Sequence, residues 1–269
     1  MSNTHARTTA DGTTLLRRTW AAAGEARGTV VIQHGLAEHS GRYEHVGAHL
    51  AAAGFDVIAE DARGHGESGG ARTDIDRYET FLDDLAVAVQ DATGTVVLYG
   101  HSFGGLLATV YMLEDRPMPD LLVLSAPFYD ANVPIFKRVA AHMLPRVLPR
   151  LRIPLGLKKD QLARDPAVGE AYFADPLVAT NATVRLGGEF VALQERVTKE
   201  LRGFGVPTLV IHGGSDPIVP PELTAPLADM PGVERHLFPA YRHESHNEDG
   251  GVETLRVITE WLDRQLSGS

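Results

Sequence analysis

Five short apolar runs constrain the fold of this chain more than any other feature of its sequence. They are nearly continuous in Val, Leu and Ile, a pattern typical of strands buried on both faces of a parallel sheet. Residues 45–54 and 78–92, which lie between runs, show helical spacing. The runs cover residues 29–33, 55–59, 95–99, 121–125 and 207–212. Strands that alternate with helices predict an α/β domain with a mostly parallel central sheet.

This alternation stops between about residues 128 and 206, where no strand-like run occurs. An insertion between two strands would form a cap over the strand ends, so we expect a core of residues 1–127 and 207–269 and a helical cap of 128–206. The main interpretation of the cap's apolar stripe is packing onto the core, and the alternative is contact with acyl chains or lipid. The stripe comprises Ile135, Phe136, Val139, Met143, Leu144, Val147 and Leu148.

Charge and composition exclude several classes of function. The formal net charge is −10, whereas a protein that binds a nucleic-acid duplex needs a basic face for the phosphates. The same charge disfavours electrostatic docking on anionic lipid and leaves open an apolar contact of the cap with a membrane or micelle. The chain has no cysteine, which rules out disulfides, thiolate metal sites and a thiol nucleophile.

The sequence also predicts where the protein resides. The first twenty residues contain no apolar stretch of signal-peptide length, and no segment approaches the roughly 18 apolar residues of a membrane span. The absence of cysteine fits a reducing compartment. We therefore expect a cytoplasmic protein, with peripheral contact to a membrane left open.

A candidate nucleophile follows the third apolar run. Residues 100–104 spell Gly-His-Ser-Phe-Gly, between a predicted strand and the helix-like residues 104–113. Strand, Ser102 and helix in this order form the context of a nucleophile elbow, whose tight turn requires small residues two positions on either side of the serine. The turn exposes the hydroxyl at a helix N-terminus, where negative charge is favoured.

Two backbone N–H groups are the candidate oxyanion hole. The first apolar run ends in His34-Gly35-Leu36, and an N–H just after such a turn faces the serine from the neighbouring strand. We assign the donors to Leu36 and Phe103. The loss of one such donor typically costs about 3–4 kcal/mol of transition-state stabilisation.

The acid and the base follow in the chain order Ser, Asp, His that is typical of such hydrolases. Asp216 lies in a loop directly after the run 207–212, at a carboxyl strand end where active sites gather in α/β sheets. His236 falls in a strand-like stretch, and spacing alone does not choose between His243 and His246 as the base. The sequence His-Glu-Ser-His is one residue short of a zinc-binding HExxH, so we predict no metal and no cofactor.

With these residues in place, the chain resembles the monoacylglycerol lipase and lysophospholipase branch of the α/β hydrolases from about residue 28 to the C-terminus. The resemblance implies an α/β-hydrolase fold with a mobile helical cap. In that family the catalytic histidine occurs in an HExxNE stretch. This match selects His243 as the base and leaves His246 as a neighbour. The matching segments are HGLAEHSGRYEHV (34–46), DARGHGESGG (61–70), GHSFGG (100–105), LSAP (124–127), ARDPAVGEAYFADPL (163–177), HGGSDPIVP (212–220) and HESHNE (243–248).

The resemblance carries over Ser102, Asp216 and His243 as the catalytic triad, and Leu36 and Phe103 as the oxyanion donors. Two departures from the family pattern lie beside them. Phe103 replaces a common Met, which matters little for a backbone donor, and Ala37 replaces a frequent Gly. Glu38 and Arg42 are expected either to pair and brace the oxyanion loop or to form a solvated surface pair.

The function that follows is hydrolysis of a carboxylic ester through an acyl-enzyme, with monoacylglycerol as the leading substrate and a fatty acid and glycerol as products. The alternatives are a broad carboxylesterase or a lysophospholipase of the same fold. From another class, a non-catalytic ligand receptor would usually have lost a triad residue, and none is lost here. A small lipid or ester is thus the expected partner, and no nucleic acid is expected.

Overall fold

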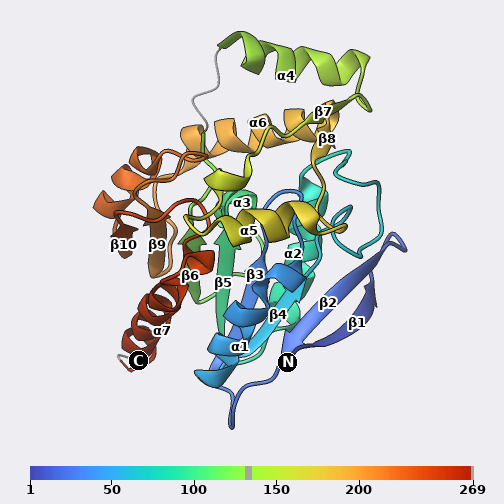
Figure 1. Ribbon diagram of the computed structural model, residues 1–269. Helices are drawn as coiled ribbons and strands as arrows, with labels where there is room; N and C mark the ends of the chain where they lie inside the picture. Colours follow the sequence, from blue (N-terminus) through green and yellow to red (C-terminus); the bar gives the residue numbers. More distant parts are fainter. Residues whose placement is uncertain (131–134, 268–269) are drawn as a thin grey trace.

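The computed structural model describes residues 1–130 and 135–267, and its core is an eight-stranded sheet of order β1-β2-β4-β3-β5-β6-β9-β10 (Figure 1). The neighbours from β4 to β10 are parallel, whereas β1 and β2 form an antiparallel edge. The predicted α/β fold with a mostly parallel sheet is therefore confirmed. The strands are β1 (Asn3–Thr8), β2 (Thr14–Trp20), β3 (Gly28–Gln33), β4 (Asp56–Glu60), β5 (Thr95–His101), β6 (Leu121–Ser125), β9 (Thr208–Gly213) and β10 (Val233–Phe238).

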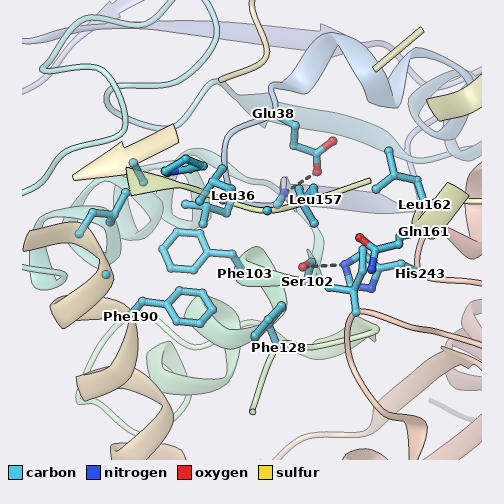
Figure 2. Close-up of a pocket in the computed structure, with 18 of the residues that line it drawn as sticks. Leu36, Glu38, Ser102, Phe103, Phe128, Leu157, Gln161, Leu162, Phe190 and His243 are labelled. Atoms are coloured by element: carbon cyan, nitrogen blue, oxygen red, sulfur yellow. Dashed lines mark hydrogen bonds between the residues drawn. The ribbon is translucent and has the colours of Figure 1, made fainter. Parts of the chain in front are cut away.

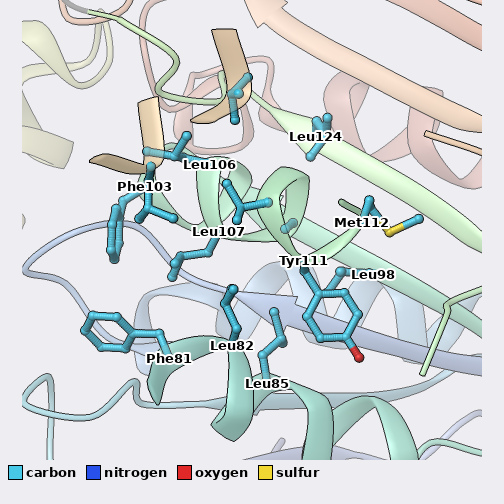
Figure 3. Packing of buried hydrophobic residues seen from close by; sticks show 14 of the residues in the cluster. Phe81, Leu82, Leu85, Leu98, Phe103, Leu106, Leu107, Tyr111, Met112 and Leu124 are labelled. Carbon is cyan, nitrogen blue, oxygen red and sulfur yellow. The ribbon is translucent and has the colours of Figure 1, made fainter. Parts of the chain in front are cut away.

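Helices cover both faces of this sheet. Helices α2 (Glu79–Asp91) and α3 (Phe103–Tyr111) pack on one face, while α1 (Glu44–Ala52) and α7 (Gly251–Ser267) pack on the other. Figure 3 shows the first of these layers, in which side chains of α2 and α3 meet the sheet. Both layers are apolar, so the strands between them are apolar on both faces, which explains their continuous Val and Leu runs.

The segment between β6 and β9 holds the elements expected of the cap. It contains a helical α4 (Ile135–Val147), α5 (Pro166–Ala174), α6 (Val184–Glu200) and the 3₁₀ turn η2 (Lys159–Gln161). It also contains a two-stranded antiparallel sheet of β7 (Arg152–Pro154) and β8 (Asn181–Thr183) that the sequence analysis did not predict. Each strand is three residues long and β7 is exposed, so neither produces an apolar run.

The described part of the apolar stripe of α4 is mostly not packed onto the core, whereas the main interpretation predicts that it is. Side chains 135–140 lie outside the described residues, which include Ile135, Phe136 and Val139 of the stripe. Leu144 is half-buried, but Met143, Val147 and Leu148 are 56%, 73% and 49% exposed. In Figure 1, α4 forms the outermost layer and lies against α6, which is the element that its described residues contact most. Most of the described part of the stripe therefore faces outward.

Ionic and polar contacts hold the inner part of the segment on the core. Arg185 of α6 pairs with Asp74 at 2.5 Å, and His39 bonds to Asp175, after α5, at 2.9 Å. The Ala179 N–H also donates to the carbonyl of Ala37, at 2.8 Å. Among residues 1–130 and 135–267, no helix is long and apolar enough to cross a membrane.

Candidate active site

The candidate nucleophile lies at a strained turn between β5 and α3. Ser102 has φ 54° and ψ −116°, a conformation that L-residues rarely adopt, and its N–H donates to the Ser125 carbonyl at 2.9 Å. The flanking glycines are a steric requirement. A Cβ on Gly104 would lie 2.1 Å from the Gln33 carbonyl oxygen, and one on Gly100 would lie 2.5 Å from that of Gly104. The elbow expected from Gly-x-Ser-x-Gly is therefore present.

Three side chains from distant parts of the chain form one hydrogen-bonded series. The hydroxyl of Ser102 donates to Nε2 of His243 at 2.8 Å, and Nδ1–H of His243 donates to Asp216 Oδ2 at 2.7 Å. The other carboxylate oxygen of Asp216 accepts the N–H groups of Ile218 and Val219. The structure therefore brings together the three residues that the sequence selected, in the order that nucleophilic catalysis needs.

The charges in this series support one another. Burial opposes ionisation of Asp216, but the charge of His243 and the hydrogen bonds of the site lower the pKa of this carboxyl well below its usual range. Burial also lowers the pKa of His243, and the neighbouring Asp216 outweighs it, so that the pKa of the imidazole is raised. A base whose protonated form is stabilised in this way is suited to accept the serine proton.

The structure distinguishes His243 from His246, between which the spacing of the sequence could not choose. Neither ring nitrogen of His246 has a hydrogen-bond partner among the described residues, and its ring stacks on Tyr43 with centroids 5.2 Å apart. Burial holds the pKa of His246 well below the ordinary histidine value. His236 lies in β10 against the ring of Phe238, as expected of a sheet residue. Only His243 contacts both other members of the series.

The two expected oxyanion donors border the serine. Leu36 follows the end of β3, and Phe103 is the first residue of α3. Neither N–H donates a hydrogen bond within the part of the chain that the structure describes, so both can serve a ligand. Ala37 adopts φ 67°, a left-handed conformation in which glycine is unstrained, which gives a physical reason for the glycine that the family often has there.

A cavity of about 490 Å³ opens above Ser102 (Figure 2). The inserted segment forms its roof and the carboxyl ends of the strands form its floor. Aromatic rings dominate one side, where Phe103 stacks on Phe190 and Phe128 meets that ring edge-on. Figure 2 shows these three rings to the left of and below Ser102, with Gln161 to its right and Glu38 above it. The cavity therefore has an apolar part and a more polar part, with the hydroxyl between them.

Glu244 is a site residue that the sequence analysis did not single out. The expected Glu38–Arg42 pair is present and buried, and Arg42 also binds Glu244 through two bonds of 2.7 Å. The pair is thus a brace rather than a solvated contact. Position 244 is beside the candidate base, but nothing in the spacing of the sequence could show a contact across 202 residues.

A histidine of α1 and a glycine-rich loop near the site also have structural partners. His45 Nε2 hydrogen-bonds to the carbonyl of His246 at 3.0 Å, and the glycine-rich loop 64–69 turns beside buried Asp61. Across residues 1–130 and 135–267, no group of three or more His, Asp or Glu side chains is placed to hold a metal ion.

The fold, together with a serine at the end of β5, defines the class: this is a serine hydrolase with the α/β-hydrolase fold. Residues 24–250 match the hydrolase family described as serine aminopeptidase, S33, and the chain belongs to that family. It is 32% identical to the monoacylglycerol lipase of Mycolicibacterium smegmatis over 95% of both chains. It is 33% identical to human monoglyceride lipase over 77% of this chain and 71% of the relative.

A solved structure agrees with these relatives. The monoacylglycerol lipase of Paleococcus ferrophilus superposes with a TM-score of 0.85 at 32% identity, over 95% of this chain and 99% of that one. The superposition extends over nearly the whole chain, so it includes the inserted segment as well as the sheet.

Proposed function

We propose that this protein is a monoacylglycerol lipase that hydrolyses its substrate through an acyl-enzyme at Ser102. The observation that carries the proposal is the series Ser102–His243–Asp216 at the floor of a largely apolar cavity. The names of the relatives support the choice of substrate class.

The chemistry runs in two steps. His243 removes the proton of Ser102 as the oxygen attacks the ester carbonyl, and Asp216 stabilises the imidazolium that forms. The Leu36 and Phe103 N–H groups bind the oxyanion. The alcohol then leaves with the proton held by His243, and the carbonyl remains bonded to Ser102. In the second step His243 activates a water molecule that hydrolyses the acyl-enzyme and restores the serine.

The cavity suits a substrate with one acyl chain and a small polar head. Its volume of about 490 Å³ falls in the range of sites for small molecules and is modest for a lipid with two or three chains. The acyl chain lies along Phe103, Phe128 and Phe190. The alcohol lies on the side of Gln161, whose Oε1 accepts the Lys158 N–H and whose NH₂ group is left for a substrate hydroxyl.

Residues 128–206 act as the lid of this site, and the outer face of α4 contacts the membrane or micelle from which the substrate comes. Met143, Val147 and Leu148 expose apolar surface there, and Leu151 and Ile153 of the following segment are also exposed. A cluster of this kind binds a lipid interface through burial of apolar side chains and does not need a basic surface.

A substrate panel tests the proposal. Monoacylglycerol is expected to have a higher kcat/KM than diacylglycerol, triacylglycerol, lysophospholipid and short aryl esters, and Ser102→Ala is expected to lower turnover by about 10⁴-fold or more. A preference for lysophospholipid or for short esters would replace the substrate assignment and leave the serine mechanism in place. Near-normal hydrolysis by Ser102→Ala would overturn the nucleophile. No hydrolysis of any ester by the unmodified protein would favour the receptor alternative.

A further inference from the structure

A buried ionic network connects the two loops that border Ser102. Arg42 lies between two carboxylates: it donates to Glu38 and makes two hydrogen bonds of 2.7 Å to Glu244, one to each oxygen. The side chains of Glu38 and Glu244 are each 3% exposed, and that of Arg42 is 11% exposed. The planar guanidinium fits a carboxylate in this two-bond geometry and fixes its orientation.

At one end, the network holds the loop of the oxyanion donor. Glu38 Oε1 accepts the N–H of Gly35 at 2.6 Å and the hydroxyl of Tyr43 at 2.8 Å. Gly35 immediately precedes Leu36. The approach is so close that a Cβ on Gly35 would lie 2.7 Å from the same oxygen. The peptide immediately before the one that carries the Leu36 N–H is therefore anchored by a carboxylate.

At the other end, the network holds the loop of the base. Glu244 is the residue after His243, and its carboxylate also accepts the side-chain amide of Asn247 at 2.7 Å. Its backbone N–H donates to the carbonyl of Leu162 in the inserted segment at 2.8 Å. Each polar group of Glu244 thus has a partner that fixes the turn on which His243 sits.

Stability alone does not account for such a network. A buried ion pair usually gains little over well-packed apolar side chains, because both charges lose their hydration. Here there are two negative charges for one positive charge, so the buried cluster carries a net negative charge next to His243. Burial opposes ionisation of Glu38 and Glu244, but Arg42 outweighs it and lowers the pKa of both carboxyls.

We propose that Glu244 is a positioning residue, which holds the base loop against the oxyanion loop through Arg42 and Glu38 and faces the imidazolium of His243 with a fixed negative charge. The proposal rests on the proposed roles of Ser102 and His243. The Glu244 side chain then has two effects on the reaction. It sets the distance between the Leu36 N–H and His243, and it stabilises the positive charge that forms on His243 in the transition state.

Other charged and titratable groups face His243 as well. Asp216 from the loop after β9 is the strongest, and His101 from β5 lies with its ring centroid 4.9 Å from that of His243. Burial lowers the pKa of His101 to about 4, so this neighbour is neutral at pH 7. Glu244 and Glu38 both act to raise the pKa of His243, after the larger effects of burial and Asp216.

Glu244→Gln tests the proposal because glutamine keeps the shape and loses the charge. With a soluble aryl ester as substrate, we expect kcat to fall about tenfold with KM within about twofold, since the loss falls on the transition state. The acid limb of kcat/KM reports the pKa of His243 in the free enzyme. Removal of a neighbouring negative charge lowers that pKa, so the limb moves to lower pH.

Glu248→Gln is the matched control. Glu248 is also a buried carboxylate in this loop with an arginine partner, Arg164, but no bond joins it to Glu38 or Arg42. We expect this variant to leave the acid limb in place whatever its effect on Tm. If Glu244→Gln moves the acid limb no further than Glu248→Gln, the proposal is wrong and the network is only structural.

Two more variants guard against a folding defect. Glu244→Asp keeps the charge and shortens the reach, so we expect an unmoved acid limb with a lowered kcat; a wild-type kcat would overturn the positioning role. The double variant Glu38→Gln/Glu244→Gln should cost less than the sum of the single effects, because both act through Arg42. Additive effects would contradict a connected network. Ser102→Ala tests the proposed function separately. If the Glu244 and Glu38 variants contradict the network but Ser102→Ala abolishes turnover, the proposed function stands and only the positioning role is wrong.

Discussion

The floor of the site and the outer helix of the cap use side chains in opposite ways. On the floor, Ser102, Asp216 and His243 are 4–8% exposed and joined by hydrogen bonds of 2.7–2.8 Å. On α4, Met143 and Val147 are more than half exposed. The pair His142–Glu195, which lies between α4 and α6, is 36–42% exposed. The polar groups are thus buried and the apolar groups are in solvent, which reverses the usual arrangement.

This difference supports the task that we propose for each region. Hydrogen bonds among buried groups are strong and keep a fixed geometry, which an acyl transfer requires. An exposed pair of this kind contributes little to stability, about 0–1 kcal/mol. A helix with apolar side chains in solvent can meet a lipid surface. Changes on the floor should therefore alter the rate of the chemistry, and changes on α4 should alter access.

The largest expected effect distinguishes the two histidines of the floor. We expect His243→Ala to lower kcat by about 10³–10⁴-fold, because Ser102 then has no base. We expect His246→Ala to destabilise the fold by about 2 kcal/mol through the cavity that it leaves, with kcat within about tenfold of the original. Steady-state kinetics and thermal unfolding of both variants measure this. The reverse order of kcat values would make His246 the base.

A smaller effect is expected in the pH dependence of kcat/KM, which reports the pKa of His243. Because the pKa of His243 is raised above the ordinary histidine value of about 6.5, kcat/KM on a soluble ester should already decline on the acid side above pH 6.5. The decline should approach tenfold for each further pH unit as His243 becomes protonated. The pH profile of kcat/KM, with a pH-stability control, measures it. Full activity down to pH 5.5 would contradict the environment described for His243.

The smallest effect is expected on α4. The triple change Met143→Ser, Val147→Ser and Leu148→Ser removes exposed apolar surface and touches no residue of the floor. We expect kcat/KM on monoacylglycerol in micelles or vesicles to fall by about 3–10-fold, and activity on a soluble aryl ester to stay within about twofold. Equal losses on both substrates would show that the face packs the cap rather than contacts lipid. Flotation with neutral phosphatidylcholine vesicles gives an independent measure of binding.

Much of the fold could be predicted because its signals are local. Continuous apolar runs marked five parallel strands, and the helical spacing of residues 45–54 marked α1, which ends just before Gly54 at φ 91°. The antiparallel strands β1 and β2 were not predicted. Both contain charged or polar residues, and β1 is largely exposed, so they lack the apolar run that marked the others. The strands β7 and β8 were not predicted either, because they too lack an apolar run.

The sequence by itself determined the candidate nucleophile, because the elbow is a property of five consecutive residues. A strained serine there needs small neighbours, with a strand before it and a helix after it. It also determined the order in which acid and base follow. Tertiary structure decided the rest, since the other contacts join residues far apart in the chain. It placed Ser102 against His243 across 141 residues and left His246 without a hydrogen-bond partner among the described residues. It also joined Arg42 to Glu244 across 202 residues. Hydrogen bonds depend on distances of about 3 Å, and only the folded chain sets such distances between remote loops.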